Sequence, residues 1–123
     1  MKKSELAIVK KVAEGIKIDN GDVLKSIVDG FDTPEKLSFG GFNAKSYVPE
    51  IVVEKQNGKK DYFIFAPKYS KKMISEEFGK WIFFNIQSKK DNGVFHLICR
   101  KDDSDKLKEL LESKQIPVEI VGY

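Results

Sequence analysis

The chain has 123 residues, of which 41% are hydrophobic and 33% are charged, and its formal net charge is +3. A chain of this length and composition is expected to form one domain over residues 1–123 with a single core. Cys99 is the only cysteine and His96 the only histidine, which excludes an internal disulfide and leaves zinc sites and Ser-His or Cys-His catalysis without support. No apolar run approaches the ~20 residues that cross a bilayer, so we expect a cytoplasmic protein without a membrane partner.

The first third of the chain contains two segments with helical spacing and one with strand character. Apolar residues recur every three to four positions over residues 4–18, which predicts an amphipathic helix. A shorter pattern of the same kind over residues 23–28 is followed by Gly30, a residue suited to a helix C-terminus, and predicts a second helix. Residues 37–42 predict a first strand, in which the pair Gly40-Gly41 favours a bend or bulge.

The centre of the chain predicts a β-hairpin. Residues 48–55 and 61–67 are rich in β-branched and aromatic side chains and read as two strands. They are joined by Gln56-Asn57-Gly58-Lys59, in which Asn-Gly supplies the positive backbone angles that a tight hairpin turn requires. We therefore expect two antiparallel strands connected by this turn.

The last third predicts two helices and two strands in alternation. Residues 72–88 are predicted to form a helix that packs on the sheet, because Trp81 lies beside apolar residues that step by four positions: Ile74, Phe78, Ile82 and Ile86. The turn Asp91-Asn92-Gly93 leads into a strand over residues 94–100, where Cys99 is expected to be buried. Ser104 is predicted to open a helix with three leucines, and residues 117–121 to form a last strand.

These elements predict an α/β fold with a mixed sheet of four or five strands, flanked by helices. The hairpin supplies an antiparallel side, whereas the final strand, helix and strand favour parallel pairing through a right-handed crossover. The predicted order is a helix, a second short helix, three strands, a helix, a strand, a helix and a strand.

Two short segments of the hairpin resemble a known family. Val48-Pro49-Glu50 is similar to the pair of proline and acid that opens the second strand of the PD-(D/E)XK nuclease-like superfamily, also called restriction-endonuclease-like. Ala66-Pro67-Lys68 is similar to the end of the third strand in that family, which normally carries an acid, a spacer and a lysine. The resemblance implies an α-β-β-β-α-β-α-β core over nearly the whole chain.

The resemblance also implies a metal-dependent phosphodiester site. In that chemistry two carboxylates hold Mg²⁺ or Mn²⁺, which activates a water, and a lysine stabilises the developing negative charge. Glu50 and Lys68 occupy the positions of the first acid and the lysine, but position 66 is alanine and offers no ligand. Glu14 on the first helix corresponds to a carboxylate that some members add, and is the candidate second metal ligand. Glu50 can equally be a strand acid or the partner of a lysine.

Lysines gather around the predicted hairpin. The stretch contains Asp61 as its only acid and these lysines: Lys55, Lys59, Lys60, Lys68, Lys71 and Lys72. A run of lysines on one side of a domain is typical of an edge that faces phosphates. Lysines also make a hairpin turn soluble and prevent the aggregation of an exposed edge strand. The sequence leaves both interpretations open.

Three functions follow from these features. The first is a non-catalytic nuclease-like domain that binds DNA or RNA, or supports a nucleoprotein assembly, with Lys55, Lys59, Lys60, Lys71 and Lys72 as contacts. The second is a Mg²⁺- or Mn²⁺-dependent nuclease with Glu50, Glu14 and Lys68 in its site. The third is a module for protein interaction or homodimerisation, which uses an exposed hairpin edge or the aromatic helix around Trp81. The alanine at position 66 favours the first.

Overall fold

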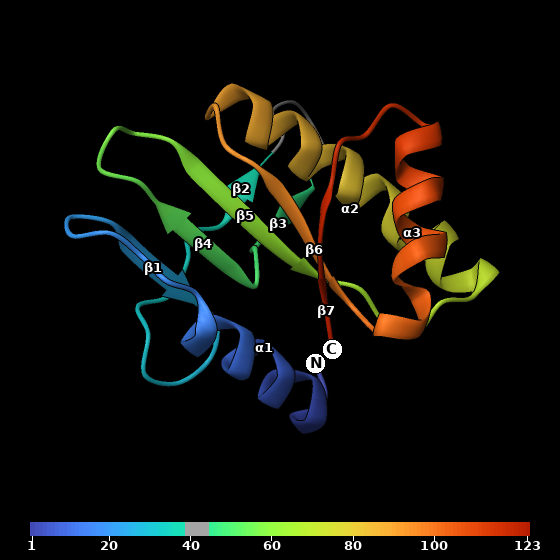
Figure 1. Ribbon diagram of the computed structural model, residues 1–123, viewed down its shortest axis with the longest axis horizontal. Coiled ribbons are helices and arrows are strands. Elements are labelled where there is room, and N and C mark those ends of the chain that lie inside the picture. Colours follow the sequence, from blue (N-terminus) through green and yellow to red (C-terminus); the bar gives the residue numbers. More distant parts are fainter. Residues whose placement is uncertain (39–44) are drawn as a thin grey trace.

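The computed structural model describes residues 1–38 and 45–123 (Figure 1). In chain order its elements are α1 (Lys3–Gly15), β1 (Val23–Ser26), β2 (Leu37–Ser38), β3 (Ser46–Tyr47), β4 (Ile51–Glu54), β5 (Lys60–Phe65), α2 (Lys71–Lys90), β6 (Phe95–Cys99), α3 (Lys101–Ser113) and β7 (Glu119–Gly122). The chain is therefore an α/β protein, as the sequence predicts.

The main sheet has five strands in the order β1-β4-β5-β6-β7. β4 pairs antiparallel with β1 and with β5, whereas β5 pairs parallel with β6 and β6 with β7. The predicted mixed sheet is confirmed, with its antiparallel strands on one side and its parallel strands on the other. The short strands β2 and β3 form a separate antiparallel pair between β1 and β4 in the chain.

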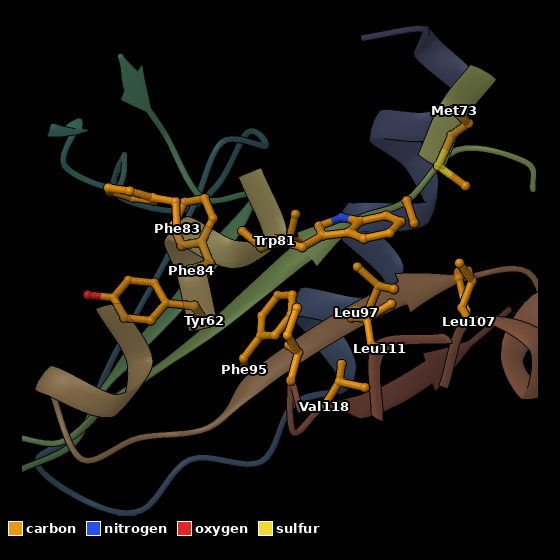
Figure 2. Close-up of a cluster of buried hydrophobic side chains, with 14 of the residues drawn as sticks. Tyr62, Met73, Trp81, Phe83, Phe84, Phe95, Leu97, Leu107, Leu111 and Val118 are labelled. Atoms are coloured by element: carbon orange, nitrogen blue, oxygen red, sulfur yellow. The ribbon is translucent and has the colours of Figure 1, made fainter. Parts of the chain in front are cut away.

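The sheet separates α1 from α2 and α3 (Figure 1). Side chains alternate between the two faces of a strand, so each face of the sheet forms its own hydrophobic cluster. On one face, Val9 and Ala13 of α1 pack on Ile51 and Phe63. On the other, α2 and α3 pack on a larger cluster (Figure 2), whose buried members include Tyr62, Ile64, Ala66, Trp81, Phe84, Leu97, Leu107 and Leu111.

The predicted hairpin is confirmed as β4 and β5, with Ile51 paired with Phe63 and Glu54 with Lys60. Of the pair Asn57-Gly58, predicted to supply positive backbone angles, only Gly58 lies in the left-handed region, with φ of 91°. The amide of Gly58 donates to the carbonyl of Lys55 at 2.9 Å and closes the turn. The two strands lie inside the sheet, since β1 and β6 flank them. The prediction of an exposed hairpin edge is therefore wrong, and the edge strands of the main sheet are β1 and β7.

The predicted second helix is wrong, because residues 23–26 form β1 and pair with β4. Leu24, Ser26 and Val28 alternate inward, and Ser26 is buried with its hydroxyl donating to the carbonyl of Glu50 at 2.9 Å. The apolar residues of this segment also fit a helical spacing. Pairing with β4 gives the buried hydroxyl of Ser26 the carbonyl of Glu50 as its acceptor. The first strand of the sheet is thus β1. Of the strand predicted over residues 37–42, the structure describes β2, and residues 39–42 lie outside the described part.

The boundaries of the helices differ modestly from the predictions. α1 begins at Lys3 and ends at Gly15, and α2 extends from Lys71 to Lys90 with the Ser70 hydroxyl accepting from the amide of Met73 at 3.0 Å. α3 begins at Lys101 and not at Ser104, whose hydroxyl instead donates to the carbonyl of Lys101 at 2.7 Å. A serine inside the first turn can bond to a carbonyl of its own helix, which the sequence pattern cannot distinguish from a cap.

Candidate nucleic-acid interface

Glu50 is a buried acid with a lysine beside it. It lies just before β4 on the face covered by α2, only 4% of the residue is exposed, and its Oε1 is 3.5 Å from the Nζ of Lys80. The other oxygen, Oε2, is buried without a hydrogen-bond partner among the described residues. The interpretation of Glu50 as the partner of a lysine is therefore confirmed, and the partner comes from α2.

Burial raises the pKa of Glu50 above its ordinary value of 4.5, because a charged carboxylate loses its hydration there. The positive charge of Lys80 and the nearby amides of Glu50 and Phe65 act in the opposite direction without cancelling the effect. The carboxyl group therefore ionises less readily than an exposed glutamate, and the ammonium group of Lys80 is already its neighbour.

The structure does not assemble two carboxylates and a lysine around Glu50. Ala66 is fully buried in the cluster under α2, Lys68 is exposed, and Glu14 is exposed on α1, across the sheet from Glu50. Within residues 1–38 and 45–123, no three His, Cys, Asp or Glu side chains are placed to share a metal ion. Since Lys80 lies where a cation would approach Glu50, these residues do not fit Mg²⁺ or Mn²⁺.

The candidate lysines fall into two groups, at the hairpin turn and at the start of α2, and these two segments lie at opposite ends of β5 (Figure 1). Lys55, Lys59 and Lys60 lie at the hairpin turn, before β5, whereas Lys71 and Lys72 begin α2 after β5. The six residues of β5 separate the groups by about 20 Å. Although the sequence presents them as one stretch, they do not form one continuous surface.

Two of the three lysines at the hairpin turn, Lys55 and Lys60, lie near acids, whereas Lys59 has no ion pair among the described residues. Lys55 lies 3.7 Å from Asp22 and 4.0 Å from Asp61, and Lys60 lies 3.6 Å from Glu54. Glu54 also contacts Lys25 of β1 at 2.9 Å. These pairs reduce the positive potential at this end of the sheet.

A cavity of about 470 Å³ lies at the other end of the sheet. We call it the carboxyl-end pocket, because it lies where β5, β6 and β7 end, and it is lined by the start of α1, the start of α2 and the segments after β5 and β6. Its charged residues are Lys2, Lys68, Lys72, Arg100, Glu5, Glu76 and Glu77. Ligands of open α/β sheets bind at this edge, outside the carboxyl ends of the strands.

The carboxyl-end pocket has four cationic and three acidic side chains, which leaves a small positive excess. Glu76 lies 3.9 Å from Lys72, and Glu5 accepts from the backbone amide of Lys2 at 2.9 Å. Lys68 has no acid within ion-pair distance among the described residues. Arg100 is contacted at 3.6 Å by Asp102, whose side chain is 87% exposed, so solvent weakens that pair. The first turns of α1 and α2 add the positive end of each helix dipole.

Three of the residues that define these sites were missed by sequence reasoning. Lys80 carries a signal in hindsight, because it lies on the buried side of α2 between Met73 and Phe84 in helical spacing. Lys2 and Arg100 carry no comparable signal. Lys2 precedes α1 and Arg100 follows β6, and only the tertiary structure brings these two positions together at the pocket.

The aromatic helix proposed as a partner surface is a core element. Trp81 and Phe84 are fully buried and Phe83 is 8% exposed (Figure 2). The ring of Tyr47 lies 5.2 Å from that of Phe83. The alternative of core packing, which the sequence left open, is therefore confirmed for these three side chains.

Comparisons of the chain with family models, with curated proteins and with solved structures find no match. In the described part of the chain, no helix has the length and apolar character needed to cross a membrane.

Proposed function

We propose that this chain is a non-catalytic nuclease-like domain that binds nucleic acid through its phosphate backbone, at the carboxyl-end pocket. The observation that carries the proposal is the cavity lined by Lys2, Lys68, Lys72 and Arg100 at the end of the parallel strands. Lysine and arginine side chains that neutralise phosphates supply most of the affinity of sequence-independent binding. DNA and RNA share this backbone, so both are candidate ligands.

The order of the elements supports the nuclease-like part of the proposal. If the separate pair β2 and β3 is left aside, the chain runs α1, β1, β4, β5, α2, β6, α3, β7. This is the order of a helix, three strands, a helix, a strand, a helix and a strand that the resemblance implies.

The surroundings of Glu50 favour binding over cleavage. A phosphodiesterase site of this type needs two carboxylates that are free to hold a metal. Glu50 is instead buried against Lys80, and the position of the second acid is the buried Ala66. Cleavage of DNA or RNA in the presence of Mn²⁺ that is lost in Glu50→Ala would contradict this part of the proposal.

The proposal is tested by fluorescence anisotropy with labelled DNA and RNA oligonucleotides over a series of salt concentrations. The affinity should fall as salt rises, and Lys68→Gln combined with Arg100→Gln should reduce the slope of log K against log salt by about 1.5. The matched control combines Lys55→Gln and Lys60→Gln, which remove two positive charges at the hairpin turn and should change the slope little. No binding at low salt, or equal effects of the two double variants, would exclude the pocket as the binding site.

A further inference from the structure

The chain contains three Asn-Gly pairs in which the asparagine is exposed, and the structure gives them different surroundings. They are Asn20-Gly21 before β1, Asn57-Gly58 in the hairpin turn and Asn92-Gly93 before β6. In such pairs the glycine amide can attack the asparagine side chain, because glycine presents no side chain to obstruct the ring closure, and asparagine is among the thermolabile residues. The sequence alone ranks the three pairs equally.

The reaction requires the peptide group between the two residues to rotate freely. The backbone nitrogen of the glycine attacks Cγ of the asparagine and forms a five-membered succinimide, and ammonia leaves. Water then adds at one of the two imide carbonyls and opens the ring to aspartate or to isoaspartate. A glycine amide that is held in a hydrogen bond has to break this bond first, which raises the barrier.

Two of the three glycine amides are held by the fold. The amide of Gly58 donates to the carbonyl of Lys55 at 2.9 Å, and the side-chain oxygen of Asn57 accepts from the amide of Lys59 at 3.1 Å. The amide of Gly93 donates to the carbonyl of Ser88 at 2.9 Å. Gly93 is also pressed against β5, since a Cβ at this position would lie 1.7 Å from the carbonyl oxygen of Lys60.

The amide of Gly21 is not held in this way, although the amide of Asp19 donates to Oδ2 of Asp22 at 3.1 Å and a Cβ at Gly21 would lie 3.0 Å from the side chain of Gln56. Within the described residues neither the carbonyl of Asn20 nor the amide of Gly21 forms a hydrogen bond, although the turn is closed by the amide of Asp22 donating to Asp19 at 3.0 Å. We infer that Asn20 is a site of spontaneous deamidation, with water as the co-reactant, and that the fold protects Asn57 and Asn92.

The modification would change the turn that precedes β1. Asp22 accepts from the amide of Gln56 at 3.0 Å and lies 3.7 Å from Lys55, so a new carboxylate at position 20 joins an acidic turn that already neutralises this lysine. Conversion lowers the formal net charge by one unit, and isoaspartate adds a carbon to the backbone ahead of the edge strand β1. This turn lies beside the hairpin turn, away from the carboxyl-end pocket, so the inference is independent of the proposed nucleic-acid binding.

The test incubates the intact chain in mildly alkaline buffer and measures aspartate and isoaspartate at each site by peptide mass spectrometry. We expect Asn20 to convert about tenfold faster than Asn57 or Asn92, since one hydrogen bond and its backbone restraint separate them. A parallel incubation in urea removes the fold, and there the three rates should converge. Asn20→Gln serves as the control, because it should abolish the early product and leave the other two sites unchanged.

Two results would overturn the inference. One is conversion of Asn57 or Asn92 in the folded chain at a rate equal to or above that of Asn20. The other is the same ranking in urea as in buffer, which would assign the difference to local sequence and not to the hydrogen bonds of Gly58 and Gly93.

Discussion

Glu50 gains its properties from residues that are distant in the sequence. The carboxylate is covered by α2 and approached by Lys80, thirty positions further along the chain. The sequence marks Glu50 as an acid at the start of a strand and correctly offers a lysine as its partner. It cannot name that lysine, because the pairing depends on which side of α2 faces the sheet.

The raised pKa of Glu50 predicts a pH dependence of stability. As the pH falls through the raised pKa towards 4.5, the folded state takes up a proton that the unfolded state does not, so this group contributes more stability. The contribution is complete below 4.5 and is lost as the pH rises through the folded pKa. Urea unfolding of the native chain and of Glu50→Gln at a series of pH values tests it. The native chain should gain stability relative to the variant on acidification, and parallel curves would refute the assignment.

Gly93 is required by close packing and not by a special backbone angle. A Cβ at this position would meet the carbonyl oxygen of Lys60, a backbone atom that cannot move without disturbing β5. We expect Gly93→Ala to lower the free energy of unfolding by about 2 kcal/mol or more. The matched control is Gly79→Ala within α2, where a Cβ meets nothing within 4 Å and should stabilise the helix by about 0.5–1 kcal/mol. Two changes of the same sign would contradict this difference between the sites.

At the scale of elements, α2 shows what a hydrophobic stripe can and cannot specify. The four-residue steps correctly predict a helix, but Ile82 and Ile86 are 40% and 43% exposed. The buried side instead contains Met73, Trp81 and Phe84. Apolar residues surround most of this helix, so the periodicity could not decide which side contacts the sheet.

Substitutions on the two sides of α2 should differ in their effects. Ile82→Gln and Ile86→Gln should each change the free energy of unfolding by less than about 0.5 kcal/mol, because these residues lie on the exposed side of α2. Phe84→Ala should cost about 3–5 kcal/mol, because its ring is fully buried beside that of Tyr62. Thermal and urea denaturation measure both. A large loss at Ile82 or Ile86 would mean that this side of the helix is covered in solution.

The segment that forms β1 shows that a local sequence pattern does not reveal the pairing of distant strands. Its four residues alternate and pair with β4, but so short a segment is also compatible with a helical turn. The pairs Leu24 with Val53 and Ser26 with Ile51 decide between the two, and pairing between segments is not visible in the local pattern. The hairpin was predictable because its two strands and its turn are adjacent in the chain.

At the scale of the whole molecule, the fold separates charges that the sequence groups together. The lysines at the hairpin turn meet Asp22 and Glu54, whereas Lys68 is joined in the carboxyl-end pocket by Lys2 and Arg100. Composition and local patterns predicted the α/β class and the mixed sheet. The location of the positive surface could not be predicted, because it depends on an acid just before β1, on an acid of β4 and on cations that lie far apart in the chain.

The most direct measurement of the binding site is an NMR titration of the isotope-labelled chain with an unlabelled oligonucleotide. Nucleic-acid binding at the carboxyl-end pocket predicts that backbone amides of residues 2–5, 68–73 and 100–102 shift on addition of the ligand. Amides of residues 55–60 at the hairpin turn should remain unchanged. Shifts confined to the hairpin turn, or no shifts at low salt, would contradict the proposed site.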